Sequence, residues 1–136
     1  MTNIYNLFKF IENKEGYRTP FKYKILNDPS SITKDDLIVN GYLDLSNTPI
    51  TSLPDNLTVK KDLSIYNTKL TSLPDNLKVG GDLYLSDIPI TSFPDNLIVR
   101  GTLYLKDTPL YKKYTIDQLK QMLPGMKGAI HFYNIV

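Results

Sequence analysis

Few side chains in this sequence are of the types that carry catalytic chemistry. The chain has one histidine, His131, and no cysteine, which excludes thiol nucleophiles, disulfides and metal sites built from several His or Cys side chains. His131 with Asp82 or Asp62 would be an acid–base pair. In the repeat described below, however, His131 lies two strands from Asp82, or about 10 Å, and no Ser is paired with it by a recognised spacing. We therefore predict a protein that is not an enzyme, with no catalytic residue.

Two repeated sets of charged side chains could bind ions or nucleic acid. Three aspartates recur every 20 residues: Asp55, Asp75 and Asp95. They could form a calcium ladder, but such residues more often cap turns, and we predict no metal or other cofactor. Five basic residues form the second set: Lys60, Lys61, Lys78, Arg100 and Lys127. Asp62 and Asp82 interrupt this set and the net charge is only +2, so we do not expect nucleic-acid binding, which gains from an uninterrupted basic field.

The elements that position these side chains form an internal repeat. Three ungapped copies follow one another with a period of 20: residues 50–69, 70–89 and 90–109. A shorter copy precedes them at 32–49, so the array occupies residues 32–109, and residues 126–132 align with the strand of the last full copy. Such an array predicts a solenoid of about five coils, in which each unit buries its apolar face only against its neighbours.

Each copy contains the alternating pattern of a β-strand. In the copy at residues 70–89 the apolar positions alternate from Leu77 through Val79 to Leu83 and Leu85. The Pro, Asn and Asp residues that follow favour a turn and an extended return rather than a helix. Stacking such units predicts one parallel sheet along one face of the solenoid.

The repeat resembles the leucine-rich repeat in its short LxLxxNxLTxLPxxL form. The matching segment is Leu83-x-Leu85-x-x-Ile88-x-Ile90-Thr91-x-Phe93-Pro94-x-x-Leu97. Bacterial effectors with 20-residue LPX repeats are similar, as are bacteriophage and bacterial proteins with LTSLPDNLxVGGDLxL copies. The resemblance covers residues 32–136 and implies an α/β solenoid that recognises proteins through its strand face. The family's turn asparagine is Thr or Ile here, so the usual asparagine ladder is absent, and the effectors' ligase domain is missing.

The N-terminal segment, residues 1–31, is predicted to cap the first coil with a helix and a short strand. Apolar residues at positions i, i+3, i+4 and i+7 predict an amphipathic helix over residues 3–13. They are Ile4, Leu7, Phe8 and Ile11, with Thr2 as the N-cap. Residues 21–25 alternate between apolar and basic side chains, which predicts the strand.

The C-terminal segment, residues 110–136, is predicted to cap the other end with a helix and a final strand. A capping box that starts at Thr115 opens a helix through about Met122. Residues 130–136 then form an edge strand, which is either covered by this helix or open for pairing with another chain. We expect the whole chain to be a single domain.

Outward-pointing strand positions are predicted to form three columns across the sheet. The first contains Asp44, Ser64, Tyr84, Tyr104 and His131; the second contains Tyr42, Asp62, Asp82, Thr102 and Ala129; the third contains Asn40, Lys60, Gly80, Arg100 and Lys127. Tyr and Arg dominate protein–protein hot spots, although packing between neighbouring strands also favours aromatic side chains. We predict a non-enzymatic protein-binding module with five contact residues: Tyr42, Tyr84, Tyr104, Arg100 and His131.

The resemblance to phage-type repeats suggests the class of partner, and the lack of a membrane-spanning run or signal peptide suggests the location. The phage-type repeats imply a phage protein that acts on a host or defence component. The alternative is a structural protein that self-associates, as a homodimer or a larger particle, through its C-terminal edge strand. No apolar run approaches the roughly 20 residues of a membrane span, and no signal peptide is recognised. We therefore expect no membrane contact and a cytoplasmic location, in the host cytoplasm if the protein is viral.

Overall fold

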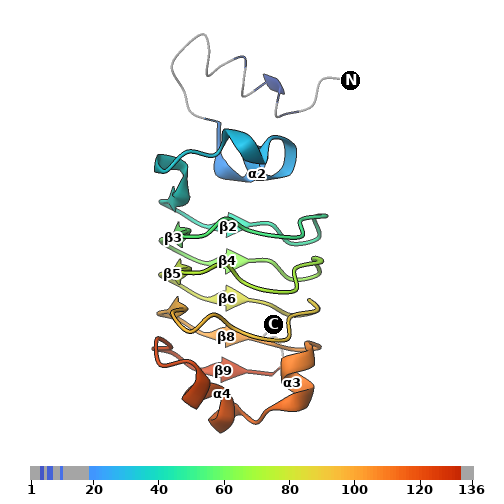
Figure 1. Ribbon diagram of the computed structural model, residues 1–136, viewed down its shortest axis with the longest axis vertical. Helices are drawn as coiled ribbons and strands as arrows, with labels where there is room; N and C mark the ends of the chain where they lie inside the picture. The colour runs from blue at the N-terminus through green and yellow to red at the C-terminus, as the bar shows by residue number, and fades with distance from the viewer. Residues whose placement is uncertain (1–3, 5, 8–9, 11–18, 133–136) are drawn as a thin grey trace.

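The computed structural model of the chain is a solenoid of stacked parallel strands (Figure 1). It describes residues 4, 6, 7, 10 and 19–132. Sheet A contains β1 (Ile38–Val39), β3 (Thr58–Val59), β5 (Lys78–Val79) and β7 (Ile98–Val99). Sheet B contains β2 (Leu43–Asp44), β4 (Leu63–Ser64), β6 (Leu83–Tyr84), β8 (Leu103–Tyr104) and β9 (Ile130–His131). The predicted solenoid is therefore confirmed.

Strand pairing follows the period of the sequence. In sheet B, Leu63 pairs with Leu83 and Leu83 with Leu103, in parallel register. The side chains of these three leucines are fully buried, so the register lines up the core residues of successive coils. The last pairing joins Leu103 to Ile130, because a longer insert precedes β9. Register thus brings the same repeat position of every coil to the same place in the stack.

The prediction of one strand and one sheet per copy is wrong, because each coil turns a corner between two short strands. In the copy at residues 70–89, the corner between β5 and β6 contains Gly80 and Gly81. A Cβ at Gly80 would collide with the backbone carbonyl of Lys60, and one at Gly81 with the carboxylate of Asp62. The corner therefore places each coil's backbone close against the preceding coil. Alternation of inward and outward side chains continues across the corner, so the sequence pattern does not reveal it.

Turns on the return side of the coils are held by an asparagine ladder. The Asn76 side chain donates to Asn56 Oδ1 at 2.8 Å, and the Asn96 side chain donates to Asn76 Oδ1 at 2.6 Å. Asn56 and Asn76 have left-handed backbone, with φ of 67° and 61°, which Asn tolerates better than most residues. This ladder lies at the Pro-Asp-Asn turn rather than at the position where the resemblance implies one.

The prediction of a strand over residues 21–25 is wrong, because these residues belong to α2 (Phe21–Asn27). Phe21 and Lys24 are three positions apart on this helix and both are buried, so the alternating pattern also satisfies a helical spacing. Two 3-10 helices follow, η1 (Pro29–Ser31) and η2 (Asp35–Leu37). Of the predicted helix over 3–13, only residues 4, 6, 7 and 10 are described, and these are helical. Thr2, Phe8 and Ile11 lie outside the described residues.

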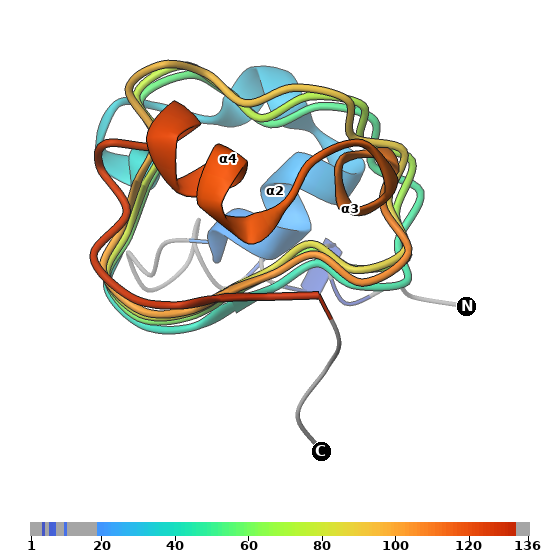
Figure 2. The same cartoon turned by 90° about the horizontal axis from the view of Figure 1, so that it is seen from below.

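Two helices lie at the C-terminal end of the stack, α3 (Pro109–Lys113) and α4 (Ile116–Met122), while α2 lies at the opposite end (Figures 1 and 2). The capping box is confirmed. Thr115 Oγ1 accepts a hydrogen bond from the backbone N–H of Gln118, and Gln118 Oε1 accepts one from the backbone N–H of Thr115. Helix α3 was not predicted from the sequence, although Thr108 as N-cap and Pro109 at the first position are a recognised helix-start signal.

The predicted last strand is described as far as residue 132, and its remainder lies outside the described residues. Within the described part, α4 packs against β9, and Leu119 and Ile130 are both buried. None of the helices formed by the described residues combines the length and apolar character needed to cross a bilayer.

Candidate binding face

Three aromatic side chains form a ladder on the outward side of sheet B. Strand register places Tyr84, Tyr104 and His131 side by side on β6, β8 and β9. The rings of Tyr84 and Tyr104 are stacked, with centroids 4.6 Å apart and planes 3° apart. The rings of Tyr104 and His131 are also stacked, at 5.6 Å and 19°. The prediction that these residues share one column is confirmed.

The members of this aromatic ladder differ in exposure. Tyr84 and His131 are half-buried, whereas Tyr104 is only 8% exposed. A stacked ring between two others loses both faces to its neighbours, which accounts for the burial of Tyr104. The accessible surface of the ladder therefore belongs mainly to Tyr84 and His131, while Tyr104 stacks against both rings.

The other two predicted contact residues lie away from the aromatic ladder. Tyr42 precedes β2 at the first corner and is 68% exposed, and Lys61 Nζ lies 5.1 Å from the centroid of its ring. Arg100 follows β7 and lines a hollow on sheet A together with Lys60 and Lys78. The five predicted residues therefore do not form one patch, because the corner of the coil separates Arg100 from sheet B.

The aspartates at the corner bind the backbone of the next coil. Asp62 Oδ1 accepts from the Asp82 amide at 2.8 Å, and Asp82 Oδ1 accepts from the Thr102 amide at 2.8 Å. Their role is to link coils, and glycine at positions 81 and 101 leaves room for the two carboxylates. Position 61 is different because the first corner carries Tyr42 instead of an aspartate, and Lys61 fits there with its ammonium over the ring.

The acid–base pair considered from the sequence is not assembled. His131 lies on β9, and β8 separates this strand from β6, which Asp82 precedes. The Asp82 carboxylate instead accepts from the Thr102 amide through Oδ1 and from the Tyr84 hydroxyl through Oδ2, the latter at 3.4 Å. Asp82 therefore links two coils through the Thr102 amide, and its negative charge acts on the Tyr84 hydroxyl.

The environment of Tyr84 makes its hydroxyl difficult to ionise. Burial, followed by the negative charge of the nearby Asp82, raises the pKa of Tyr84 to about 12 from an ordinary value of 10. A phenolate at this position would face a carboxylate and would be poorly solvated. The Tyr84 phenol therefore stays protonated to a higher pH than an ordinary tyrosine.

This shift gives an expected result for alkaline titration. Near-ultraviolet absorbance of the folded protein should show one tyrosine that ionises near pH 12, and Tyr84→Phe should remove that late step. Because an unfolded tyrosine loses its proton near pH 10, this group should also lower folding stability above that pH. Tyr66→Phe, at an exposed tyrosine, is the control and should leave the late step intact. If Tyr84→Phe instead removed a tyrosine step near pH 10 and kept the late step, the arrangement of the ladder would be contradicted.

The repeated aspartates of the Pro-Asp-Asn turns also support turns. Asp55 Oδ1 accepts from the Asp75 amide of the next coil at 2.9 Å. Among the described residues there is no group of three His, Cys, Asp or Glu side chains that could hold a metal ion. Asp55 therefore links its own turn to the turn of the next coil.

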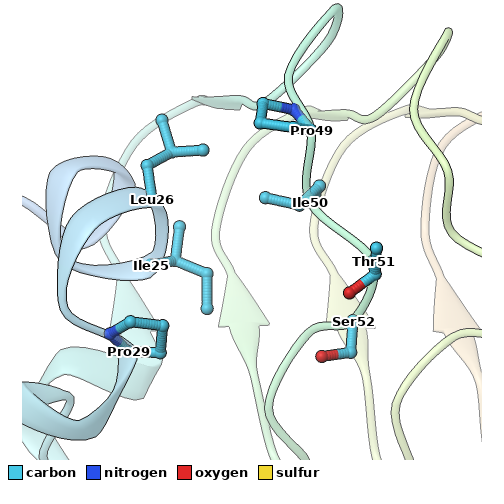
Figure 3. Close-up of a pocket in the computed structure, with 7 residues that line it drawn as sticks. All are labelled: Ile25, Leu26, Pro29, Pro49, Ile50, Thr51 and Ser52. Atoms are coloured by element: carbon cyan, nitrogen blue, oxygen red, sulfur yellow. The ribbon is translucent and has the colours of Figure 1, made fainter.

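A further hollow of about 220 Å³ lies between α2 and the first coil (Figure 3). Ile25 and Leu26 on α2 point across it toward Pro49 and Ile50 of the coil. Pro29, Thr51 and Ser52 complete the lining, so none of its lining residues is titratable. This hollow separates the faces of two packed elements and offers no group for acid–base or metal chemistry.

Two outward faces of the described residues have side chains suited to binding, the aromatic ladder on sheet B and the basic hollow on sheet A. The helices α2, α3 and α4 lie at the two ends of the stack, not over the strands of sheet B (Figures 1 and 2). No model of a protein family, no curated protein and no solved structure matches this chain.

Proposed function

We propose that this chain is a non-enzymatic protein-binding module, built as a short capped solenoid of the leucine-rich-repeat type, and that it recognises a protein partner through sheet B. The observation that carries the proposal is the stacked ladder of Tyr84, Tyr104 and His131. Rings already held by their neighbours lose little side-chain entropy on binding, and Tyr is enriched among residues that dominate interface energies.

The ladder favours a partner that buries apolar or aromatic side chains against it. Its rings present edges and partly exposed surface, and the Tyr84 hydroxyl is directed to Asp82. Tyr42, at the first corner, is a separate exposed aromatic side chain nearer the N-terminal end of the stack. The resemblance to phage-type repeats supports a partner in a bacterial host or its defence system, met in the cytoplasm.

Self-association through the C-terminal strand is the weaker candidate. Ile130 on β9 is 4% exposed and α4 packs against this strand, so its described apolar side chain is already used within the chain. Pairing through the edge would then rely on backbone groups rather than on buried apolar area. The side chains of the aromatic ladder would contribute more to the free energy of binding than those of this edge.

The proposal predicts that removal of the two accessible rings abolishes partner capture. Tagged wild type, Tyr84→Ala/His131→Ala and the control Tyr66→Ala are each incubated with lysate of the source cell or its host, followed by mass spectrometry. Tyr66 is also an exposed tyrosine, 39% exposed, but it lies in the turn after β4 and outside the ladder. We expect one protein to be retained by wild type and Tyr66→Ala and lost from the double variant.

Binding of that purified protein should then weaken by about 10- to 100-fold in the double variant, as for a hot-spot pair. Circular dichroism and thermal melting check that both variants remain folded. Equal binding by the double variant and Tyr66→Ala would reject sheet B as the recognition face. Capture of the chain by itself alone, with mass in solution that rises with concentration, would favour the C-terminal edge.

A further inference from the structure

Sheet A carries a basic hollow on its outward side, separate from the aromatic ladder. The hollow has a volume of about 480 Å³, and its lining includes Lys60, Lys78 and Arg100 together with Thr58, Gly80 and Ile98. Gly80 follows β5, between Lys60 of the preceding coil and Arg100 of the next. Because a Cβ at Gly80 would meet the Lys60 carbonyl, this position carries no side chain that could occupy the hollow between the two cations.

Among the described residues, no acidic side chain neutralises the three cationic side chains of the basic hollow. All three residues are exposed, and no acidic side chain lines the hollow. Within residues 19–132, none of the three forms an ion pair or a side-chain hydrogen bond. The basic hollow is therefore a concave surface with three cations available to a ligand.

The acidic residues that interrupt the basic set in the sequence do not interrupt it in space. Asp62 follows Lys60 and Lys61, and Asp82 follows Gly80 and Gly81, each on the side of its corner toward sheet B. Each directs Oδ1 to a backbone amide of the following coil at 2.8 Å. Sequence proximity therefore overstated their effect on Lys60 and Lys78. The basic hollow has a more continuous positive character than the order of residues indicates.

The spacing of the cations along the stack fits an extended ligand. The Lys127 amide donates to the Val99 carbonyl, which places the exposed Lys127 one coil beyond Arg100. From Lys60 to Lys127 is three strand spacings, or about 14 Å. An extended peptide repeats same-side residues about every 6.8 Å, so two to three acidic side chains span this distance.

A nucleic-acid strand fits these observations less well. Single-stranded nucleic acid gains affinity when its bases stack on aromatic side chains beside a basic track. Here the aromatic rings lie on sheet B and stack on one another, with Tyr84 and Tyr104 only 4.6 Å apart. The net charge of +2 also provides little of the general attraction that phosphate backbones require.

We infer that the basic hollow binds an extended acidic peptide segment of a protein partner, with its carboxylates against Lys60, Lys78 and Arg100. This inference rests on the proposed function in one respect, namely that the ligand is a protein. It uses a different sheet from the aromatic ladder and therefore gives the module a second, electrostatic contact. Binding through exposed charges should weaken as salt screens them.

A labelled peptide with alternating Glu and Ser residues tests the inference by fluorescence anisotropy at low salt. The variant Lys60→Gln/Lys78→Gln/Arg100→Gln removes three charges from the basic hollow. The control Lys69→Gln/Lys106→Gln/Lys120→Gln removes three charges from exposed residues that do not line it. We expect the dissociation constant to rise at least about tenfold in the first variant, because direct charge contacts with the peptide are lost. In the control it should rise about twofold or less, because only the general positive field of the protein is reduced.

Several outcomes would overturn the inference. These are an equal loss of affinity in the two triple variants, equal binding of a peptide with Gln in place of Glu, and tighter binding of an oligonucleotide with the same number of charges. Absence of measurable peptide binding by wild type at low salt would also reject it. The Tyr84→Ala/His131→Ala variant should still bind the peptide, so a failure of the aromatic-ladder proposal and a failure of this one give different results.

Discussion

Lys24→Ala is expected to lower the free energy of unfolding by about 3–5 kcal/mol, because it leaves a buried carboxylate without its cation. Lys24 Nζ lies 2.9 Å from Asp36 Oδ2, and the two side chains are 6% and 5% exposed. Lys24 belongs to α2 and Asp36 to η2, so the pair joins the N-terminal helix to the segment that enters β1. Chemical denaturation of the wild type and the variant measures the difference.

The same pair makes stability depend on acid. Burial by itself raises the pKa of Asp36, but hydrogen bonds from the Thr33 amide and hydroxyl and the charge of Lys24 outweigh it, and the net pKa is lowered from 3.8. A carboxyl whose pKa is depressed on folding stabilises the folded state above its unfolded pKa. This contribution should be fully present above about pH 4 and should be lost as pH falls through the lowered folded-state pKa.

Two variants distinguish a paired charge from a generally sensitive site. Lys24→Met/Asp36→Leu removes both charges and should cost less than the sum of Lys24→Ala and Asp36→Ala. Lys22→Ala, on the same helix but half-exposed, should change the free energy of unfolding by no more than about 0.5 kcal/mol. If Lys24→Ala cost no more than Lys22→Ala, the ion pair would have no role in holding α2.

Gly101→Ala is expected to be the second strongly destabilising change. A Cβ at this position would lie 2.7 Å from the carbonyl carbon and oxygen of Gly81 and would collide with the Asp82 carboxylate. Overpacking of this kind costs about 1–3 kcal/mol. Displacing Asp82 from the partly buried Thr102 amide would add about 0.5–1.5 kcal/mol, the usual net contribution of a hydrogen bond.

Gly41→Ala is the matched control, since Gly41 occupies the same repeat position in the first coil. A Cβ there meets none of the described atoms within 4 Å, because no earlier copy of the repeat precedes the one at residues 32–49. Its effect on the free energy of unfolding should therefore stay within about 0.5 kcal/mol. Equal effects of the two substitutions would show that the corner is not limited by contact between coils.

The amino-acid sequence by itself determined the solenoid and its register. Three ungapped copies of 20 residues leave one pairing that aligns Leu63, Leu83 and Leu103 in the core, since a slip of one residue would turn every apolar side chain outward. The same register places Tyr84, Tyr104 and His131 in one column. These features are predictable because they follow from periodicity, which every copy repeats.

Only the tertiary structure decided how those columns are distributed in space. Alternation states which side chains point inward, but it is unchanged when the chain turns a corner at Gly80 and Gly81. The angle at that corner separates Arg100 from the tyrosines and leaves Asp62 and Asp82 bonded to neighbouring coils.

The secondary structure of the N-terminal segment was likewise decided by a contact between residues far apart in the sequence. Five residues that alternate Phe, Lys, Tyr, Lys and Ile satisfy either a strand or a helix, and local propensity does not choose between them. The buried pair between Lys24 and Asp36, 12 residues apart, exists only with Lys24 on the inner side of α2. Periodicity reports burial along one element, whereas the partner of a buried charge depends on the packing of elements against one another.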